Sequence, residues 1–298
     1  MPVSRLKRPL AIASLVYAAT LWGLVWYPYR LLGEAGVGGI VSSFFSYAVP
    51  LLLLGWLHGR AVAAARPRWT WLAAMGLAAG WTNLAYVLAV LEGEVVRVLL
   101  LFYLAPLWTV LFARLLLREQ LNRAGWAVMG LAAGGAIVML WQPGDWPLPA
   151  NRAEWLGLSA GFMFAASNVI SRHLEGVAAG AKSTAVWAGV TVLTLAGLAL
   201  NPAELDFAAS AGVATWGLLI GVALLIGSMT YAVQYGLAFV PANQAIVIFL
   251  FELVVAAVSA YFLSDERMGA QEWAGAAMII TASLFSGHME DRREDTHV

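Results

Sequence analysis

The chain alternates long apolar runs with short polar connections. Each run is roughly 18–25 residues long, and at 1.5 Å per residue such a helix crosses the ~30 Å hydrocarbon core of a bilayer. The connections leave no room for a folded domain outside the membrane. The pattern therefore predicts ten membrane-spanning helices, at roughly residues 10–29, 38–57, 69–91, 95–117, 124–141, 155–172, 183–200, 212–236, 241–263 and 270–288.

Composition agrees with this pattern. Of the 298 residues, 61% are hydrophobic and 11% are charged, whereas soluble domains are nearer about 45–50% and 25%. The expected fold class is an all-α polytopic membrane protein. The chain has no cysteine and a formal net charge of zero, which excludes disulfides and thiolate metal sites and gives a nucleic-acid partner no electrostatic support. No cofactor is expected, and the lipid bilayer is the expected surrounding.

The basic residues predict an orientation, because cytoplasmic loops of membrane proteins are enriched in Lys and Arg. With a cytoplasmic N-terminus, 13 basic residues fall on the inner side and 4 on the outer side. The inner set is Arg5, Lys7, Arg8, Arg60, Arg66, Arg68, Arg114, Arg118, Arg123, Arg172, Lys182, Arg292 and Arg293, and the outer set is Arg30, Arg97, Arg152 and Arg267. Both termini are therefore predicted to be cytoplasmic, in a bacterial-type inner membrane. The run at 10–29 is too long for a signal peptide and is expected to remain as the first span.

The sequence repeats itself after 147 residues. With this offset, residues 103–107 align with 250–254, Glu119 with Glu266, and Trp126 with Trp273. The repeat predicts two five-helix halves, at 1–141 and 153–288, joined by a loop at 142–152 and followed by a tail at 289–298. Because five is odd, the second half enters the membrane upside down. Inverted repeats around a midplane site are typical of secondary transporters; the alternative is a duplication that only built a stable bundle.

Pro106 interrupts the fourth predicted span. Proline has no N–H to donate to the carbonyl of Phe102, so a break is expected there. In lipid, such a break is stable only where protein or water meets the freed carbonyl. This helix is therefore expected to face the interior of the bundle and to take part in gating.

Small residues four apart allow helix backbones to approach closely in a membrane. The chain has such pairs at Gly76/Gly80, Gly130/Gly134, Gly157/Gly161 and Gly217/Gly221. We expect them to serve packing inside the chain, with a dimer interface as the alternative. The sequence is compatible with a monomer and leaves the oligomeric state open.

The repeated block resembles a known family. The residues Tyr-Leu-Ala-Pro at 103–106, Arg-Glu-Gln-Leu at 118–121, Trp126 and Gly130, repeated in part at 265–267, resemble the drug/metabolite transporter superfamily and, within it, EamA-type exporters. Residues 102–106 and the Trp-rich first span are most similar to the aromatic amino acid exporter branch. The resemblance covers nearly the whole chain and implies export of small metabolites, often amino acids, through a central cavity without ATP hydrolysis. Many relatives have Glu-Pro in the ninth span, where this chain has Glu252-Leu253, so the second half lacks a proline break.

Polar side chains inside spans are costly and mark candidate sites. Glu252 is near the middle of the ninth span and shares a helix face with Gln244. It could accept a substrate ammonium or carry a proton; alternatively, it is a buried carboxyl that ties helices together. The other candidates line corresponding helices of both halves, and each could instead be a packing or interfacial residue. The predicted substrate-binding set is Trp22, Trp26, Asn83, Tyr86, Phe102, Tyr103, Phe164, Asn168, Ser171, Tyr231, Gln234, Gln244 and Glu252.

These residue types suit a neutral amino acid as the transported partner. Aromatic faces accept a cation or another ring, and Asn, Gln and Tyr can donate to a carboxylate. A phosphate-bearing substrate would need clustered Lys or Arg at mid-span, and none is present. Exporters of other small metabolites or of cationic or aromatic drugs are the alternative, although the first span has no acid such as the small multidrug relatives use.

An enzyme is not expected. The four histidines, His58, His173, His288 and His297, are at predicted span ends or in the tail, and no metalloprotease, nucleophile-elbow or phosphate-loop motif occurs. Proton coupling, exchange and facilitated diffusion are all compatible with the sequence.

Overall fold

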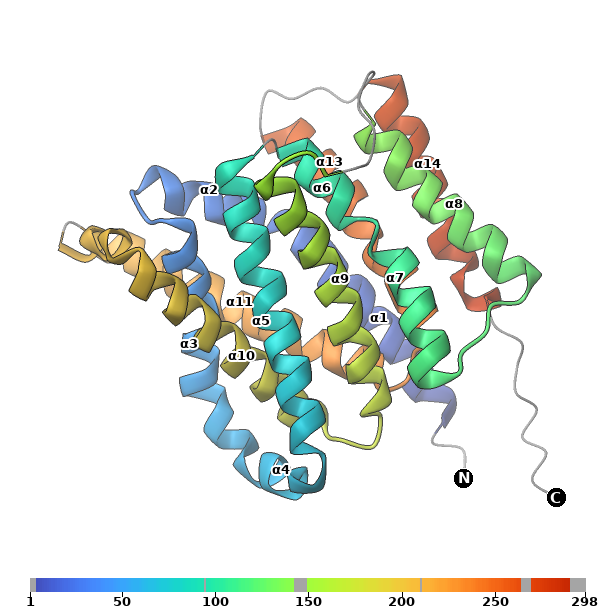
Figure 1. The fold of residues 1–298 in the computed structure, drawn as a ribbon, viewed down its shortest axis with the longest axis horizontal. Coiled ribbons are helices and arrows are strands. Elements are labelled where there is room, and N and C mark those ends of the chain that lie inside the picture. The colour runs from blue at the N-terminus through green and yellow to red at the C-terminus, as the bar shows by residue number, and fades with distance from the viewer. Residues whose placement is uncertain (1–3, 94, 142–148, 210, 264–268, 290–298) are drawn as a thin grey trace.

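The computed structural model describes residues 4–93, 95–141, 149–209, 211–263 and 269–289, and these residues form helices and connections without a strand. Figure 1 shows their arrangement. The longer helices are α1 (Ser4–Leu24), α2 (Trp26–Glu34), α3 (Gly39–Leu54), α5 (Trp69–Glu92), α6 (Val95–Phe102), α7 (Ala105–Phe112), α8 (Arg123–Leu140), α9 (Arg152–His173), α10 (Ala179–Leu200), α11 (Val213–Leu237), α12 (Ala242–Phe249), α13 (Phe251–Leu263) and α14 (Ala270–Phe285). The short ones are η1 (Gly55–His58), α4 (Gly59–Ala64), η2 (Arg66–Arg68), η3 (Ala113–Leu117), η4 (Pro202–Ala209) and η5 (Ser286–His288).

Helical segments occupy all ten predicted span ranges within the described residues. Eight of the helical stretches there are long and apolar enough to cross a membrane. The other two ranges hold α9, which carries several polar residues, and α14, which has 16 residues. The chain is thus a polytopic helical membrane protein, and the ten-span count stays a prediction. The predicted connecting loop at 142–152 and tail at 289–298 lie mostly outside the described residues.

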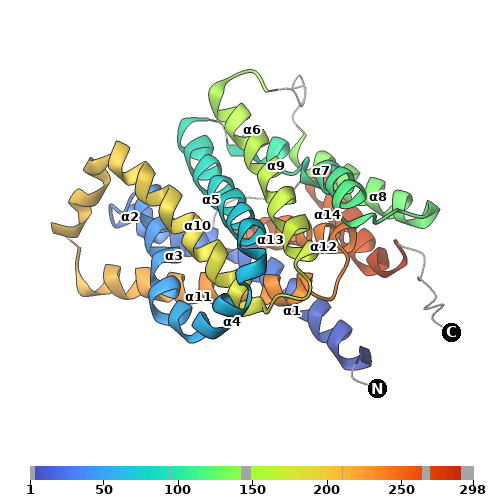
Figure 2. The same ribbon diagram turned by 60° about the horizontal axis from the view of Figure 1, so that its bottom comes forward.

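The two sequence halves pack against each other rather than forming separate bundles. α5 packs on α9 and α10, and α1 packs on α11 and α13. α8 pairs with α14 at one edge of the molecule, while α3 and α10 lie at the opposite edge (Figures 1 and 2). The fourth and ninth predicted spans meet between the halves, since α7 packs on α9 and α12, and α12 packs on α1.

Three of the predicted spans are interrupted. The first is divided between α1 and α2, because Pro28 has no N–H for the carbonyl of Leu24, where α1 ends. The fourth is divided between α6 and α7, as Pro106 predicts: α6 ends at Phe102, the residue whose carbonyl the proline leaves free.

The ninth span is interrupted too, although it lacks the proline that many relatives have there. α12 ends at Phe249 and α13 begins at Phe251. No proline is involved; instead, the N–H of Leu253 bonds to the carbonyl of Leu250 at 3.1 Å in a tighter i→i+3 turn. We attribute this break to packing, since α1 passes so closely that a Cβ on Gly23 would lie 2.6 Å from the carbonyl oxygen of Glu252.

The predicted close packing at paired glycines holds for two of the four pairs. Gly76 and Gly80 lie on the backbone of α10, and Gly157 and Gly161 lie on that of α6. It was wrong for Gly217 and Gly221, where a Cβ would meet nothing within 4 Å. Of the remaining pair, Gly130 is open and Gly134 meets only the side chain of Met278. Close approach needs a facing backbone as well as a small residue.

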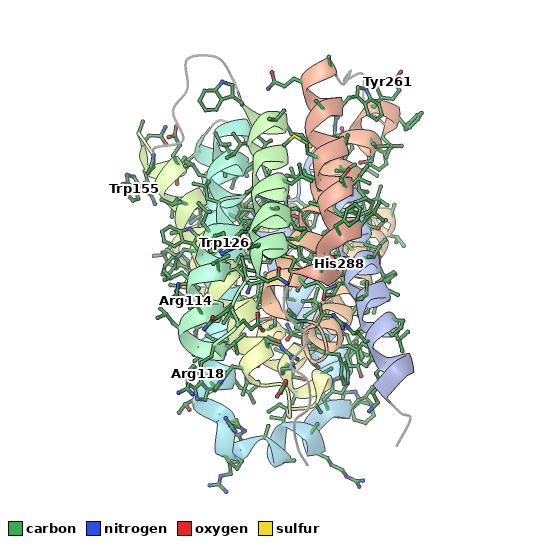
Figure 3. The ribbon with its side chains drawn as sticks, turned by 90° about the vertical axis from the view of Figure 1, so that its right-hand side faces the viewer. Arg114, Arg118, Trp126, Trp155, Tyr261 and His288 are labelled. Atoms are coloured by element: carbon green, nitrogen blue, oxygen red, sulfur yellow. The ribbon has the colours of Figure 1, made fainter. Side chains whose placement is uncertain are left out.

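Both ends of the described chain lie at one end of the bundle. Arg8 of α1 donates to Gln244 at the start of α12 at 3.3 Å, and the N–H of Asn122 bonds to the carbonyl of Met289 at 3.2 Å. We call this end, with Arg8, Arg118 and Arg172, the basic end. Figure 3 places Arg118 toward it and Trp155 at the opposite end.

Candidate functional site

The two interior breaks meet at one hydrogen bond. Tyr103, in the break between α6 and α7, donates its hydroxyl to Oε1 of Glu252 at 2.5 Å. Glu252 is in the first turn of α13, where the helix macrodipole favours a negative charge. Both side chains are half-buried. The tyrosine comes from the first half of the chain and the carboxylate from the second, so the site exists only at the junction of the halves.

A row of aromatic rings lies beside this pair. The row consists of Tyr86 on α5, Phe102 on α6, Phe164 on α9 and Phe249 on α12. Successive ring centroids are 5.4, 5.4 and 5.8 Å apart, and Phe102 also meets the ring of Tyr103 edge-on at 5.3 Å. Such spacings are those of favourable aromatic pairs. The row gives the site one apolar, ring-lined wall.

Gly161 fixes the position of that wall. A Cβ at Gly161 would collide with the carbonyl oxygen of Phe102, the one that Pro106 leaves without its helical partner. Gly157, one turn away, is also close to α6, since a Cβ there would lie 3.1 Å from the carbonyl oxygen of Val98. The missing side chains let α9 lie directly on α6, and Phe164 is then carried against the ring of Phe102.

Sequence reasoning missed Phe249, although a signal was present. Phe249 follows Phe102 by 147 residues, the offset of the internal repeat. The two phenylalanines end equivalent half-helices and contact the same ring, that of Phe164.

Four predicted site residues lie nearer the basic end, away from the Tyr103–Glu252 pair. Ser171 and Gln234 are buried and hydrogen-bonded to each other at 2.5 Å. Gln244 is buried at the start of α12 and accepts from Arg8. Tyr231 is 44% exposed and stacks on His58 with ring centroids 5.9 Å apart. These residues form separate contacts and do not join the pair.

The remaining predicted residues flank the pair or lie on other helices. Asn168 is one turn from Phe164 on α9; it is buried and its Nδ2 has no hydrogen-bond partner in the described part of the chain. Asn83 on α5 likewise has an unpartnered Oδ1. Trp22 packs in the apolar core around α3 and α10. Trp26 donates its indole N–H to Ser259 of α13 at 2.9 Å, so that group is already engaged.

The site offers the carboxylate of Glu252, the hydroxyl of Tyr103 and an aromatic wall that includes a second tyrosine, Tyr86. In the described ranges, no three His, Asp or Glu side chains gather as metal ligands would. Its chemistry is recognition: the carboxylate can accept from a cationic or neutral donor, and the rings can hold a flat apolar group.

The fold and the site together define a class, that of polytopic helical membrane proteins with a polar site between two interrupted helices. The model of the EamA-like transporter family matches this chain twice, at residues 9–141 and again at 151–287. The chain belongs to the EamA-like transporter family.

Individual relatives agree with the family. The chain is similar to a riboflavin transporter of Rhizobium johnstonii, with 29% identity over 85% of this chain and 82% of the relative. It is also similar to an uncharacterized transporter of Pseudomonas aeruginosa, with 30% identity over 49% of this chain and 51% of the relative. Protein RarD of Streptomyces exfoliatus is 26% identical over 52% of this chain and 49% of its own length. A solved structure titled "Crystal structure of protein" has the same fold, with a TM-score of 0.68, 18% identity, and coverage of 94% of this chain and 96% of that one.

Proposed function

We propose that this EamA-family transporter exports neutral amino acids with aromatic side chains, by alternating access and without ATP hydrolysis. The observation that supports this substrate class is the carboxylate of Glu252, bonded to Tyr103 and lying beside the aromatic row. No other candidate site residue in the described ranges carries a full charge.

The chemistry of the substrate matches these groups. The ammonium of an amino acid can bind the Glu252 carboxylate, and a charge-assisted hydrogen bond of this kind contributes about 1.5–3 kcal/mol. An aromatic side chain can stack or meet edge-on with the row, and such a ring pair contributes about 0.5–1.5 kcal/mol beyond area burial. Two unpartnered amide atoms complete the proposed set: Nδ2 of Asn168 can donate to the substrate carboxylate, and Oδ1 of Asn83 can accept from the substrate ammonium.

The proposed architecture is two five-helix halves of opposite orientation, with ten spans and the basic end in the cytoplasm of a bacterial-type cell. The double family match at 9–141 and 151–287 supports the repeat. The interrupted fourth and ninth spans, aligned by the 147-residue offset, support a pseudo-symmetric pair of gating helices. The gathering of Arg8, Arg118 and Arg172 at one end supports the orientation.

A flavin is the second candidate substrate. The similarity to the riboflavin transporter of Rhizobium johnstonii extends over 85% of this chain. Riboflavin is uncharged and has a planar ring system, which the aromatic row suits, and Glu252 would then accept from a hydroxyl or ring N–H.

Counterflow into proteoliposomes tests the proposal. In separate assays, vesicles preloaded with unlabelled tryptophan, leucine, riboflavin or a quaternary ammonium compound are given the same compound in labelled form, with and without a pH gradient. We expect rapid accumulation of tryptophan, slower accumulation of leucine, and none of the quaternary cation. Accumulation of riboflavin alone would replace the amino acid with the flavin, and accumulation of the quaternary cation alone would make the protein a drug exporter.

A further inference from the structure

Glu119 connects the two halves at the basic end. Its carboxylate accepts the N–H of Ala242 at 3.2 Å on Oε1 and 3.1 Å on Oε2, and it accepts both the N–H and the Nδ2 of Asn243 on Oε2 at 3.4 and 3.3 Å. Glu119 follows η3 in the first half, whereas these donors begin α12 in the second. The residue before α12, Pro241, provides no side-chain cap. The exposed N–H groups of this helix end are therefore satisfied from the other half of the chain.

Arg172 extends the connection to two more helices. Its Nε lies 3.9 Å from Oε1 of Glu119, and its Nη1 donates to the carbonyl of Ala238, just beyond α11, at 2.7 Å. The Glu119 and Arg172 side chains are only 11% and 20% exposed. One carboxylate thus holds together the end of α9, the end of α11 and the start of α12.

The same helix start leads to the substrate site. Ala242 precedes Glu252 by ten residues, or about 15 Å of helix. Between them, Gln244 and Ala245 are 3% and 1% exposed. Along α12, the approach from the basic end to Glu252 is closed by packed side chains.

We propose that Glu119 is a positioning residue that holds the basic end shut, and that its contacts with α12 break each time substrate reaches Glu252 from that side. This inference depends on the alternating access proposed above. Contacts made in one conformation only shift the balance between the two conformations when they are removed. Loss of the Glu119 carboxylate is therefore expected to favour the form that is open at the basic end.

Single cysteines can report this opening, because the natural chain has none. Ala245→Cys reports on the basic end, and Leu156→Cys on α9 reports on the opposite end. Each is combined with Glu119→Ala in nanodiscs, and the rate of modification by a membrane-impermeant maleimide is measured. We expect about tenfold faster modification at position 245, in line with the loss of several hydrogen bonds to a charged group, and no increase at position 156.

Glu175→Ala is the matched control, since Glu175 also pairs with Arg172, at 3.2 Å, and no hydrogen bond or ion pair joins it to α12 in the described part of the chain. It should change the rate at position 245 by less than about twofold. Glu119→Gln keeps one acceptor oxygen, so the rate of modification at position 245 should rise by only about threefold. This variant replaces Glu119→Ala if Glu119→Ala does not fold. Equal rates for the Glu119 and Glu175 variants would overturn the proposal, as would faster modification at both reporters, which indicates loosening of the fold. A tenfold change without tryptophan counterflow would leave the role of Glu119 intact and refute the proposed substrate.

Discussion

The two interrupted interior spans occupy equivalent places in the repeat but differ in how they break and in what they contribute. The break between α6 and α7 is followed by Pro106 in the first turn of α7, and it presents the hydroxyl of Tyr103. The break between α12 and α13 has no proline and presents the carboxylate of Glu252. The residues that end the preceding half-helices, Phe102 and Phe249, are both phenylalanine and contact the same ring.

This difference shows that the positions of the breaks are set separately from the side chains that they carry. The internal repeat places two breaks at equivalent positions of the sequence, whether a proline or the packing of a neighbouring helix produces them. The side chains at the breaks are free to differ, so one half supplies a donor and the other an acceptor. An asymmetric substrate with a cationic end and an aromatic end can then bind in one orientation between two similar half-structures.

The largest effect is expected at Glu252, the carboxylate beside the break between α12 and α13. Glu252→Gln keeps the shape of the side chain and removes its charge, so tryptophan counterflow should fall by about two orders of magnitude, the equivalent of ~3 kcal/mol for a buried charged pair. The control is Glu34→Gln, which changes an exposed carboxylate paired with Arg30. Counterflow at the natural rate in Glu252→Gln would show that Glu252 only ties helices together.

The second-largest effect is expected at Gly161, which allows α9 to lie against α6. Gly161→Ala forces a methyl group against the carbonyl of Phe102, and overpacking of this kind costs about 1–3 kcal/mol. A lower thermal unfolding temperature in detergent is expected, together with slower counterflow. Gly130→Ala, where a Cβ meets nothing within 4 Å, should leave the temperature unchanged or raise it slightly, because alanine favours helix. Equal temperatures for the two variants would contradict the close α6–α9 contact.

The smallest effect is expected from the proline itself. Pro106→Ala restores an N–H and makes the first break more like the second, so the maximal counterflow rate should fall by about threefold, or ~0.7 kcal/mol, with an unchanged KM. Pro50→Ala provides the control, since Pro50 lies inside the unbroken α3. A changed KM with an unchanged maximal rate would mean that Pro106 affects substrate binding and not the conformational change.

Much of the fold could be predicted because membrane spans are long and apolar. Helical segments lie in all the predicted ranges of the described chain, and the break at Pro106 follows from the chemistry of one residue. The break at Val25 could have been predicted in the same way from Pro28. The break at Leu250 could not, since it depends on how closely α1 passes Glu252 in the folded chain.

The candidate site was predictable in part for a similar reason. Tyr103 and Glu252 could be chosen because polar groups in mid-span are costly, but their hydrogen bond depends on the packing of the two halves. The predicted substrate-binding set also included residues that contact one another away from the Tyr103–Glu252 pair, such as Ser171 and Gln234. Spacing along one helix identifies a shared face, whereas the partner of that face is a property of the tertiary structure. Glu119 was recognised only as part of a repeated loop, and its aligned residue Glu266 is outside the described residues.

Tryptophan affinity in a double-mutant cycle tests the central claim, that Tyr103 and Glu252 act as one site contributed by two halves. Tyr103→Phe removes only a hydroxyl, Glu252→Gln only a charge, and the dissociation constant is measured for each variant and for the double variant. If the two groups form one site, Tyr103→Phe should weaken binding about twentyfold in the natural protein but only about twofold in the Glu252→Gln background, which is a coupling of about tenfold, or ~1.4 kcal/mol. If the two losses multiply, the groups act independently and the shared site is refuted.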